Sequence, residues 1–141
     1  MANYYNYSRT NYFRVTDEAA FNKLFQNLRA NDADMQDFTK TEDGVTLHGF
    51  GAEGSIDYYL DPDEEDPESD FDEFTSQLQK ILPEDEAFIL IEIGHMKLCE
   101  LSGFGMVVTK HDIKSVDLNS WLTNTAYDML EDPSKITHPW Y

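Results

Sequence analysis

The chain has 141 residues, of which 40% are hydrophobic and 13% aromatic, a length and composition that favour one folded domain over residues 1–141. Its 28 acidic and 10 basic residues give a net charge of −18. Because so large an excess of negative charge repels phosphate groups, it argues against DNA, RNA and anionic membranes as direct partners and favours a basic partner.

The first predicted elements are a short strand and a helix. Residues 11–15 alternate as a strand with one face towards a core does. Thr16 is a suitable N-cap for a helix that ends near residues 31–32. The apolar side chains of this helix recur at helical spacing and are Phe21, Leu24, Phe25 and Leu28.

Three further strands are predicted before residue 61. Residues 35–41 and 45–50 are β-favourable runs, and the Asp43-Gly44 pair between them is a strong signal for a hairpin. Residues 55–60 form a third strand after a glycine-rich turn.

A second helix follows a loop of acidic residues. Ser69 is expected to cap this helix, and Pro83 is expected to end it. Its apolar residues fall on one side and are Phe71, Phe74, Leu78, Ile81 and Leu82.

The most apolar strand is predicted at residues 87–93, and we expect it to be central in the sheet. A turn at residues 94–95 should lead into two more antiparallel strands, at 97–101 and 104–109. Cys99 falls in the first of these, where a buried and unreactive thiol is the expected state.

Asp117 is a suitable N-cap for a last helix, whose apolar stripe comprises Leu118, Trp121, Leu122, Thr125, Met129 and Leu130. The order of elements lacks the regular alternation of strand and helix that a parallel sheet requires. We therefore predict an α+β fold, an antiparallel sheet of about five to six strands with two to three helices packed on one face.

An acidic run dominates the charge pattern, because residues 61–73 hold nine acids and no base. Carboxylates at this density approach the charge spacing of B-form DNA, about one per 1.7 Å of axis, provided that the fold holds them in place. Leu60 before the run, and Phe71 and Phe74 near its end, are suited to anchor it. A solvated loop is the alternative reading of such a run. The candidate partner-binding residues are Asp61, Asp63, Glu64, Glu65, Asp66, Glu68, Asp70, Asp72, Glu73, Glu84, Asp85 and Glu86.

Signals for a metal site or an active site are weak. The acidic run places carboxylates at several ligand positions of a calcium-binding EF-hand loop, but Asp66 stands where that loop requires glycine and Pro67 follows. A weak divalent-cation site is the alternative there. Histidines are scattered, and no nucleophile elbow, phosphate loop or dinucleotide fingerprint is present. We expect no catalytic residues, no metal and no cofactor.

The two ends of the chain are rich in aromatic residues, which give contact area at low entropic cost. An interaction module of another kind, such as an immunity or adaptor protein, is therefore the alternative function. The aromatic residues in question are Tyr4, Tyr5, Tyr7, Tyr12, Trp140 and Tyr141.

With one cysteine and neither a signal-peptide pattern nor a long apolar run, the sequence favours a cytoplasmic location. Residues 8–18, which begin Ser-Arg-Thr-Asn-Tyr-Phe-Arg-Val, and residues 91–98 resemble small acidic proteins of phages and other mobile elements. This resemblance implies an inhibitor of host defence, of the anti-restriction or anti-CRISPR type. The expected function is thus a DNA mimic that occupies the cationic nucleic-acid site of a basic host protein or complex.

Overall fold

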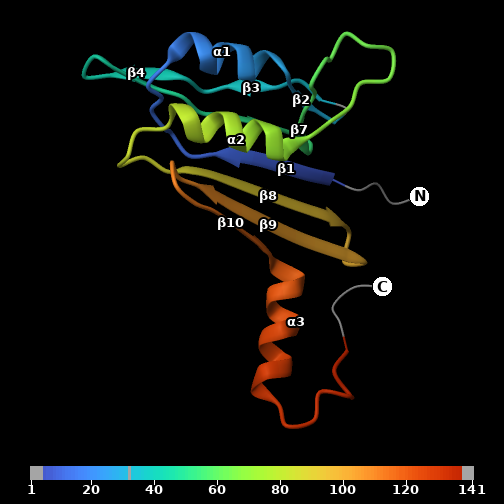
Figure 1. Ribbon diagram of the computed structural model, residues 1–141. Helices are drawn as coiled ribbons and strands as arrows, with labels where there is room; N and C mark the ends of the chain where they lie inside the picture. The colour runs from blue at the N-terminus through green and yellow to red at the C-terminus, as the bar shows by residue number, and fades with distance from the viewer. Residues whose placement is uncertain (1–4, 32, 138–141) are drawn as a thin grey trace.

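The computed structural model of the protein describes residues 5–31 and 33–137, which form three α-helices and ten β-strands (Figure 1). Six antiparallel strands make the main sheet in the order β10-β9-β8-β1-β6-β3. Their bounds are β1 Tyr5–Thr10, β3 Gln36–Asp37, β6 Phe50–Ala52, β8 Phe88–Met96, β9 Glu100–Val108 and β10 Ile113–Asp117. The predicted α+β class with an antiparallel sheet of five to six strands is confirmed.

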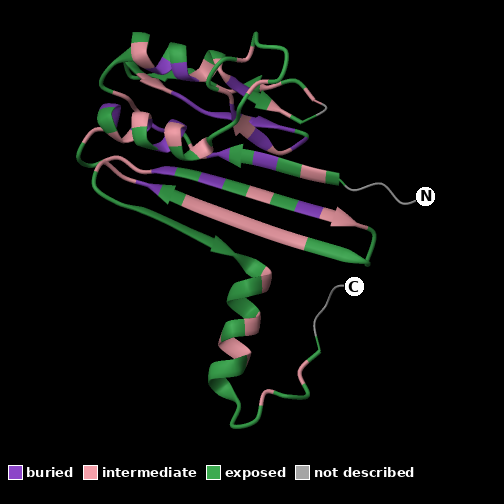
Figure 2. Ribbon diagram, turned by 45° about the vertical axis from the view of Figure 1, so that its right-hand side comes forward, coloured by how far each residue is buried: buried purple, intermediate pink, exposed green. Residues whose placement is uncertain are grey.

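Two small sheets and three helices complete the described fold. β2 (Leu28–Ala30) pairs with β7 (Ile56–Tyr58), and β4 (Lys40–Glu42) pairs with β5 (Val45–Leu47). The helices are α1 (Glu18–Gln26), α2 (Phe71–Ile81) and α3 (Leu118–Met129). Buried residues concentrate between α1, α2 and the sheet, whereas α3 extends away from the sheet and buries none of its residues (Figure 2).

A cluster of phenylalanine rings joins the sheet to its helices. Phe13 has 0% of its surface exposed, and its ring meets Phe21 of α1, Phe50 of β6 and Phe88 of β8 edge to face, with centroids 5.2–6.3 Å apart. Phe74 of α2 lies against the same rings. Aromatic pairs in this geometry add stabilisation beyond the area they bury.

The first strand differs from the prediction. The structure places it at Tyr5–Thr10 instead of residues 11–15, and of the predicted strand only Phe13 forms an isolated bridge, with His48. The inward positions of β1 are Ser8 and Thr10, whose hydroxyls bond to the Gly54 carbonyl and to the Phe50 N–H and Asn11 carbonyl. Because the inward positions of β1 are polar residues with hydrogen-bond partners, the strand does not show the alternation of apolar and polar residues by which strands are predicted.

The first two helices begin and end at residues other than those predicted. The α1 cap is Asp17, whose carboxylate accepts the Ala20 N–H, while Thr16 bonds to the Ile81 carbonyl. The α2 cap is Asp70 and not Ser69. The α1 helix also ends earlier than expected, because Leu28 pairs with β7 as part of β2.

The strands β8 and β9 form one long hairpin in place of the predicted meander. β8 continues through residues 94–95, so the turn predicted there is wrong, and the chain reverses at residues 97–99, where Lys97 has φ 50°. Cys99 lies in this turn and is exposed, which corrects the expectation of a buried thiol. Within the sheet β8 lies between β9 and β1, as its apolar character predicted.

The hairpin predicted at Asp43-Gly44 is confirmed between β4 and β5. Both residues have positive φ, 54° for Asp43 and 79° for Gly44, as a two-residue hairpin turn of type I′ requires. Among the described helices, none has the length and apolar character needed to cross a bilayer.

Replacing Phe13 by alanine should lower the free energy of unfolding by about 3–5 kcal/mol, because it leaves a cavity where the rings from α1, β6 and β8 meet. Urea denaturation followed by circular dichroism measures this loss. Leu98→Ala is the control, since Leu98 is 85% exposed and its truncation should change stability by no more than about 0.5 kcal/mol. Similar losses in both variants would contradict a core centred on Phe13.

Candidate partner-binding surfaces

The acidic segment, residues 61–73, consists of a loop closed at its base and the first turn of α2. Backbone hydrogen bonds join the two sides of the loop, from the Leu60 N–H to the Glu68 carbonyl (3.0 Å) and from the Asp70 N–H to the Tyr58 carbonyl (2.8 Å). An isolated bridge between Tyr59 and Ser69 lies between these bonds. The two ends of the loop therefore meet on the folded body, as in compact surface loops that are ordered at their base.

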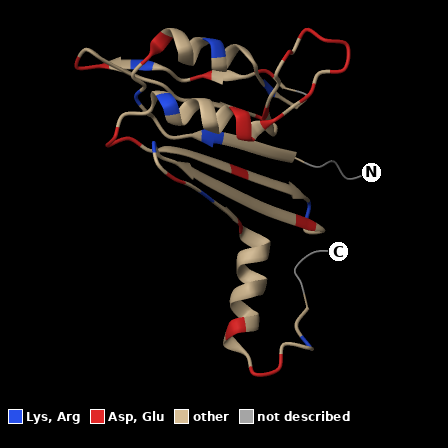
Figure 3. Ribbon diagram, viewed as in Figure 1, with Lys and Arg blue, Asp and Glu red and all other residues tan. Residues whose placement is uncertain are grey.

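The central carboxylates of the acidic segment are exposed and uncompensated. Asp63, Glu64, Glu65 and Asp66 are all exposed, and no described Lys, Arg or His side chain forms an ion pair with any carboxylate of residues 61–73. Figure 3 shows that acidic residues make up most of the loop at the end of the molecule where α2 begins. Its charge is thus open to a basic partner.

The C-terminal end of the segment is the start of α2. The Asp70 carboxylate accepts the backbone N–H groups of Asp72 and Glu73, and these two acids lie in the first turn. Negative charge is stabilising at this end of a helix, because the unpaired N–H groups make it partly positive. Three of the candidate residues therefore support the helix as well as adding to the surface charge.

The other candidate acids, Glu84, Asp85 and Glu86, lie at the opposite end of α2. Its 11 residues put about 16 Å of helix between the two groups, so they do not adjoin. Glu86 accepts from the Arg14 side chain and backbone, at 2.8 and 3.0 Å, and Asp85 accepts from the same guanidinium at 3.0 Å. Glu84 contacts His111 at 2.7 Å.

The three acids that follow α2 thus hold parts of the chain together. Hydrogen bonds to Glu86, and then to Asp85, raise the pKa of the Arg14 guanidinium above its ordinary value. The link fastens the segment before α1 to the turn before β8, over a sequence distance of 72 residues for Glu86. Surface pairs of this kind contribute little individually, but they leave these carboxylates less available to a partner than those of the acidic segment.

Two of the aromatic residues near the N-terminus belong to the main sheet. Tyr5 and Tyr7 are exposed residues of β1, and Tyr12 is exposed beside Lys40, whose ammonium lies 4.2 Å from the ring centroid. Tyr4, Trp140 and Tyr141 lie outside the described residues. The first two tyrosines form part of a larger surface that the sequence did not reveal.

This larger surface is the face of the main sheet opposite α1 and α2, here called the open sheet face. Strand register puts its residues on one side, while Phe88 and Leu90 point to the core. It consists of Tyr5, Tyr7 and Arg9 of β1, Ile89, Ile91, Ile93 and His95 of β8, Leu101, Gly103, Gly105 and Val107 of β9, and Lys114 and Val116 of β10. The signal for this face in the sequence is that β8 is apolar at both alternating sets of positions, whereas the prediction for this strand was only that it is central in the sheet.

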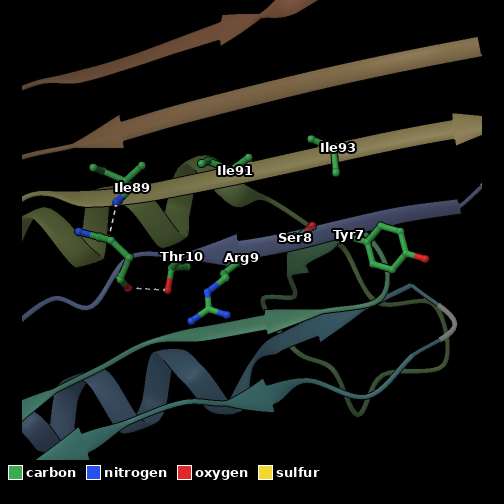
Figure 4. Close-up of a pocket in the computed structure, with 8 residues that line it drawn as sticks. Tyr7, Ser8, Arg9, Thr10, Ile89, Ile91 and Ile93 are labelled. Atoms are coloured by element: carbon green, nitrogen blue, oxygen red, sulfur yellow. Dashed lines mark hydrogen bonds between the residues drawn. The ribbon is translucent and has the colours of Figure 1, made fainter.

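A shallow groove of about 520 Å³ runs along the open sheet face between β1 and β8. Figure 4 shows Ile89, Ile91 and Ile93 in a row along β8, with Tyr7 and Arg9 projecting from the neighbouring strand. All three isoleucines are exposed, and Ile91 has 56% of its surface exposed. Contiguous apolar area of this kind marks interaction sites on soluble domains.

Across residues 5–31 and 33–137, no three His, Cys, Asp or Glu side chains gather closely enough to hold a metal ion. Compared with protein-family models, curated proteins and solved structures, the chain matches none. Arguments about its function therefore rest on its own surfaces.

Replacing Asp70 by alanine should destabilise the protein by about 1 kcal/mol, because two N–H groups of α2 lose their acceptor. Asp70→Asn removes the same charge but keeps a side-chain oxygen, so its stability should lie within a few tenths of a kcal/mol of the wild type. Urea denaturation of both variants makes the comparison. Equal losses would show that the charge of Asp70, and not its cap, supports the helix.

Proposed function

We propose that the protein is a non-enzymatic inhibitor that presents its acidic segment to the cationic nucleic-acid site of a defence complex, as a mimic of DNA. The observation that carries the proposal is the closed base of the acidic loop, where residues 58–60 and 68–70 are joined by backbone bonds. A segment held in this way loses less entropy on binding than a free acidic tail does.

The distribution of charge supports the same function. Nine carboxylates lie within residues 61–73, and those of Asp63, Glu64, Glu65 and Asp66 have no ion-pair partner in the described part of the chain. A groove that binds DNA presents Lys and Arg at the spacing of phosphates, and a row of free carboxylates satisfies those groups. Because the net charge is −18, approach to such a groove is also steered electrostatically.

The acids after α2 have a smaller part in this proposal. Glu84, Asp85 and Glu86 are engaged by Arg14 and His111 and lie at the far end of the helix. The binding surface is therefore the acidic segment itself, whose last residues form the first turn of α2. Resemblance of residues 8–18 and 91–98 to proteins of mobile elements points to restriction or CRISPR complexes as the partners to test.

The test is competition for DNA by purified restriction and CRISPR effector complexes, followed by fluorescence anisotropy of a labelled duplex. Wild-type protein should displace the duplex from its target complex, and its apparent affinity should fall as salt rises. Changing Asp63, Glu64, Glu65 and Asp66 to Asn or Gln should abolish displacement. These four residues are exposed and their side chains form no ion pair in the described part of the chain, so the variant should keep its stability.

A matched control removes the same number of charges elsewhere. Asp34, Glu42, Asp43 and Glu53 are exposed and lie outside the acidic segment, so the Asn and Gln variant of these four should compete nearly as well as the wild type. If both variants lose competition equally, net charge and not the segment governs binding. If the variant of the acidic segment still displaces DNA, the mimic proposal is wrong.

A second candidate is an interaction module that binds through aromatic residues. The observation in its favour is the exposure of Tyr5 and Tyr7 on the open sheet face. Serine at both positions should then abolish binding to the partner, whereas the variant neutralised at residues 63–66 should bind as the wild type does.

A further inference from the structure

The helix α3 lacks the packing that a helix of its length requires. It has 12 residues, and none of them is buried. Isolated helices this short are marginal in water, and most helices in proteins are stabilised by packing an apolar face. The large apolar residues that it and the next position expose are Leu118, Trp121, Leu122, Tyr127, Met129 and Leu130.

The start of α3 is fixed so that the helix points away from its own sheet (Figure 1). The helix begins directly after β10, with Asp117 as its cap. The Asn119 amide donates to the Leu101 carbonyl at 2.9 Å, and the Leu118 side chain lies over Gly103, where a Cβ would come within 3.2 Å of it. These contacts hold the first turn of the helix beside β9, and the later turns run away from the sheet (Figure 1).

The open sheet face, in turn, lacks a helix to cover it. Its central residues, Ile89, Ile91 and Ile93, have no helix over them, although the opposite face of the same strands is covered by α2 (Figure 2). One chain thus carries an apolar sheet face without a helix and an apolar helix without a sheet.

Charge distinguishes the helix from other occupants of this face. The strand positions of the open sheet face include Arg9, Lys114 and His95 but no acid, which is unusual in a chain with a net charge of −18. If two open sheet faces packed against each other, their basic residues would be brought together and would repel. The helix has no base and carries Asp128 in its last turn.

Two more acids, Glu131 and Asp132, follow the helix. Hydrogen bonds from the Ser134 hydroxyl and N–H lower the pKa of Asp132 below its ordinary value, and this favours the ionised form of its carboxylate. The end of α3 is therefore complementary in sign to the bases of the open sheet face.

We propose that two copies of the chain exchange their α3 helices about a two-fold axis, so that each helix lies across the open sheet face of the other copy. This arrangement covers the open sheet face and the apolar residues of α3 in both chains, because an isologous interface uses the same surfaces of each copy. An unrelated partner would have to supply both a helix and a sheet face. The 13 residues named for the open sheet face and the 12 residues of α3 together match a standard stable interface, which takes about 20–30 residues from each copy.

Size-exclusion chromatography with light scattering tests the exchange. The wild type should have twice the mass of the 16.3 kDa chain at micromolar concentrations. Ile91→Glu in the sheet face and Trp121→Glu in the helix should each raise the dimer dissociation constant by at least about 100-fold, because each buries an unpaired charge. Val45→Glu is the control, since Val45 is 44% exposed on the hairpin β4–β5 and should not affect the dimer.

Mixing the two variants tests whether α3 of one copy covers the open sheet face of the other. The Ile91→Glu chain has an unaltered α3, and the Trp121→Glu chain has an unaltered open sheet face. An equimolar mixture should therefore form dimers in which the first chain's helix lies on the second chain's sheet face. Circular dichroism should show that both variants remain folded, as expected for exposed positions.

Three results would overturn the proposal. The first is a wild type that is monomeric throughout the micromolar range. The second is a dimer that withstands Trp121→Glu, which would mean that the sheet faces pair without the helices. The third is a mixture that stays monomeric while each variant is folded. The proposal is independent of the DNA-mimic function, because the variant neutralised at residues 63–66 should still dimerise.

Discussion

The phenylalanine cluster around Phe13 determines how the rest of the protein is arranged. Its rings come from α1, α2, β6, β8 and the segment after β1, so the two helices are held against the same face of the main sheet. Because all of this packing lies on one face, the other face stays uncovered. The loop that enters α2 is likewise anchored through Phe74 at the start of the helix. Both candidate binding surfaces thus follow from a core that lies on one side of the sheet.

The parts of the fold that could be predicted from the sequence are those set by local chemistry. The β4–β5 hairpin needs positive φ at Asp43 and Gly44, and the cap of α3 needs only the carboxylate of Asp117. Elements that depend on distant partners were misplaced. β1 is the clearest case, since Ser8 and Thr10 are buried only because the Gly54 carbonyl and the Phe50 N–H reach them.

The same distinction applies to the candidate surfaces. Acids at residues 61–73 are adjacent in the chain, and so their grouping was evident from the sequence. The separation of Glu86 from that group could not be predicted, because it depends on the length of α2 and on Arg14, 72 residues away. An uncovered sheet face follows from the prediction that the helices pack on one face of the sheet. Its composition could not be predicted, because it depends on which strands lie beside β8 and on α3 extending away from the sheet.

The backbone closure of the acidic loop also bears on how the protein can change over generations. The bonds between residues 58–60 and 68–70 use N–H and carbonyl groups, which every residue except proline can supply in full. Side chains between them are therefore free to vary, and even a doubling of loop length costs only about 0.6 kcal/mol of closure entropy. The body below the loop therefore keeps its fold while the sequence and length of the loop change.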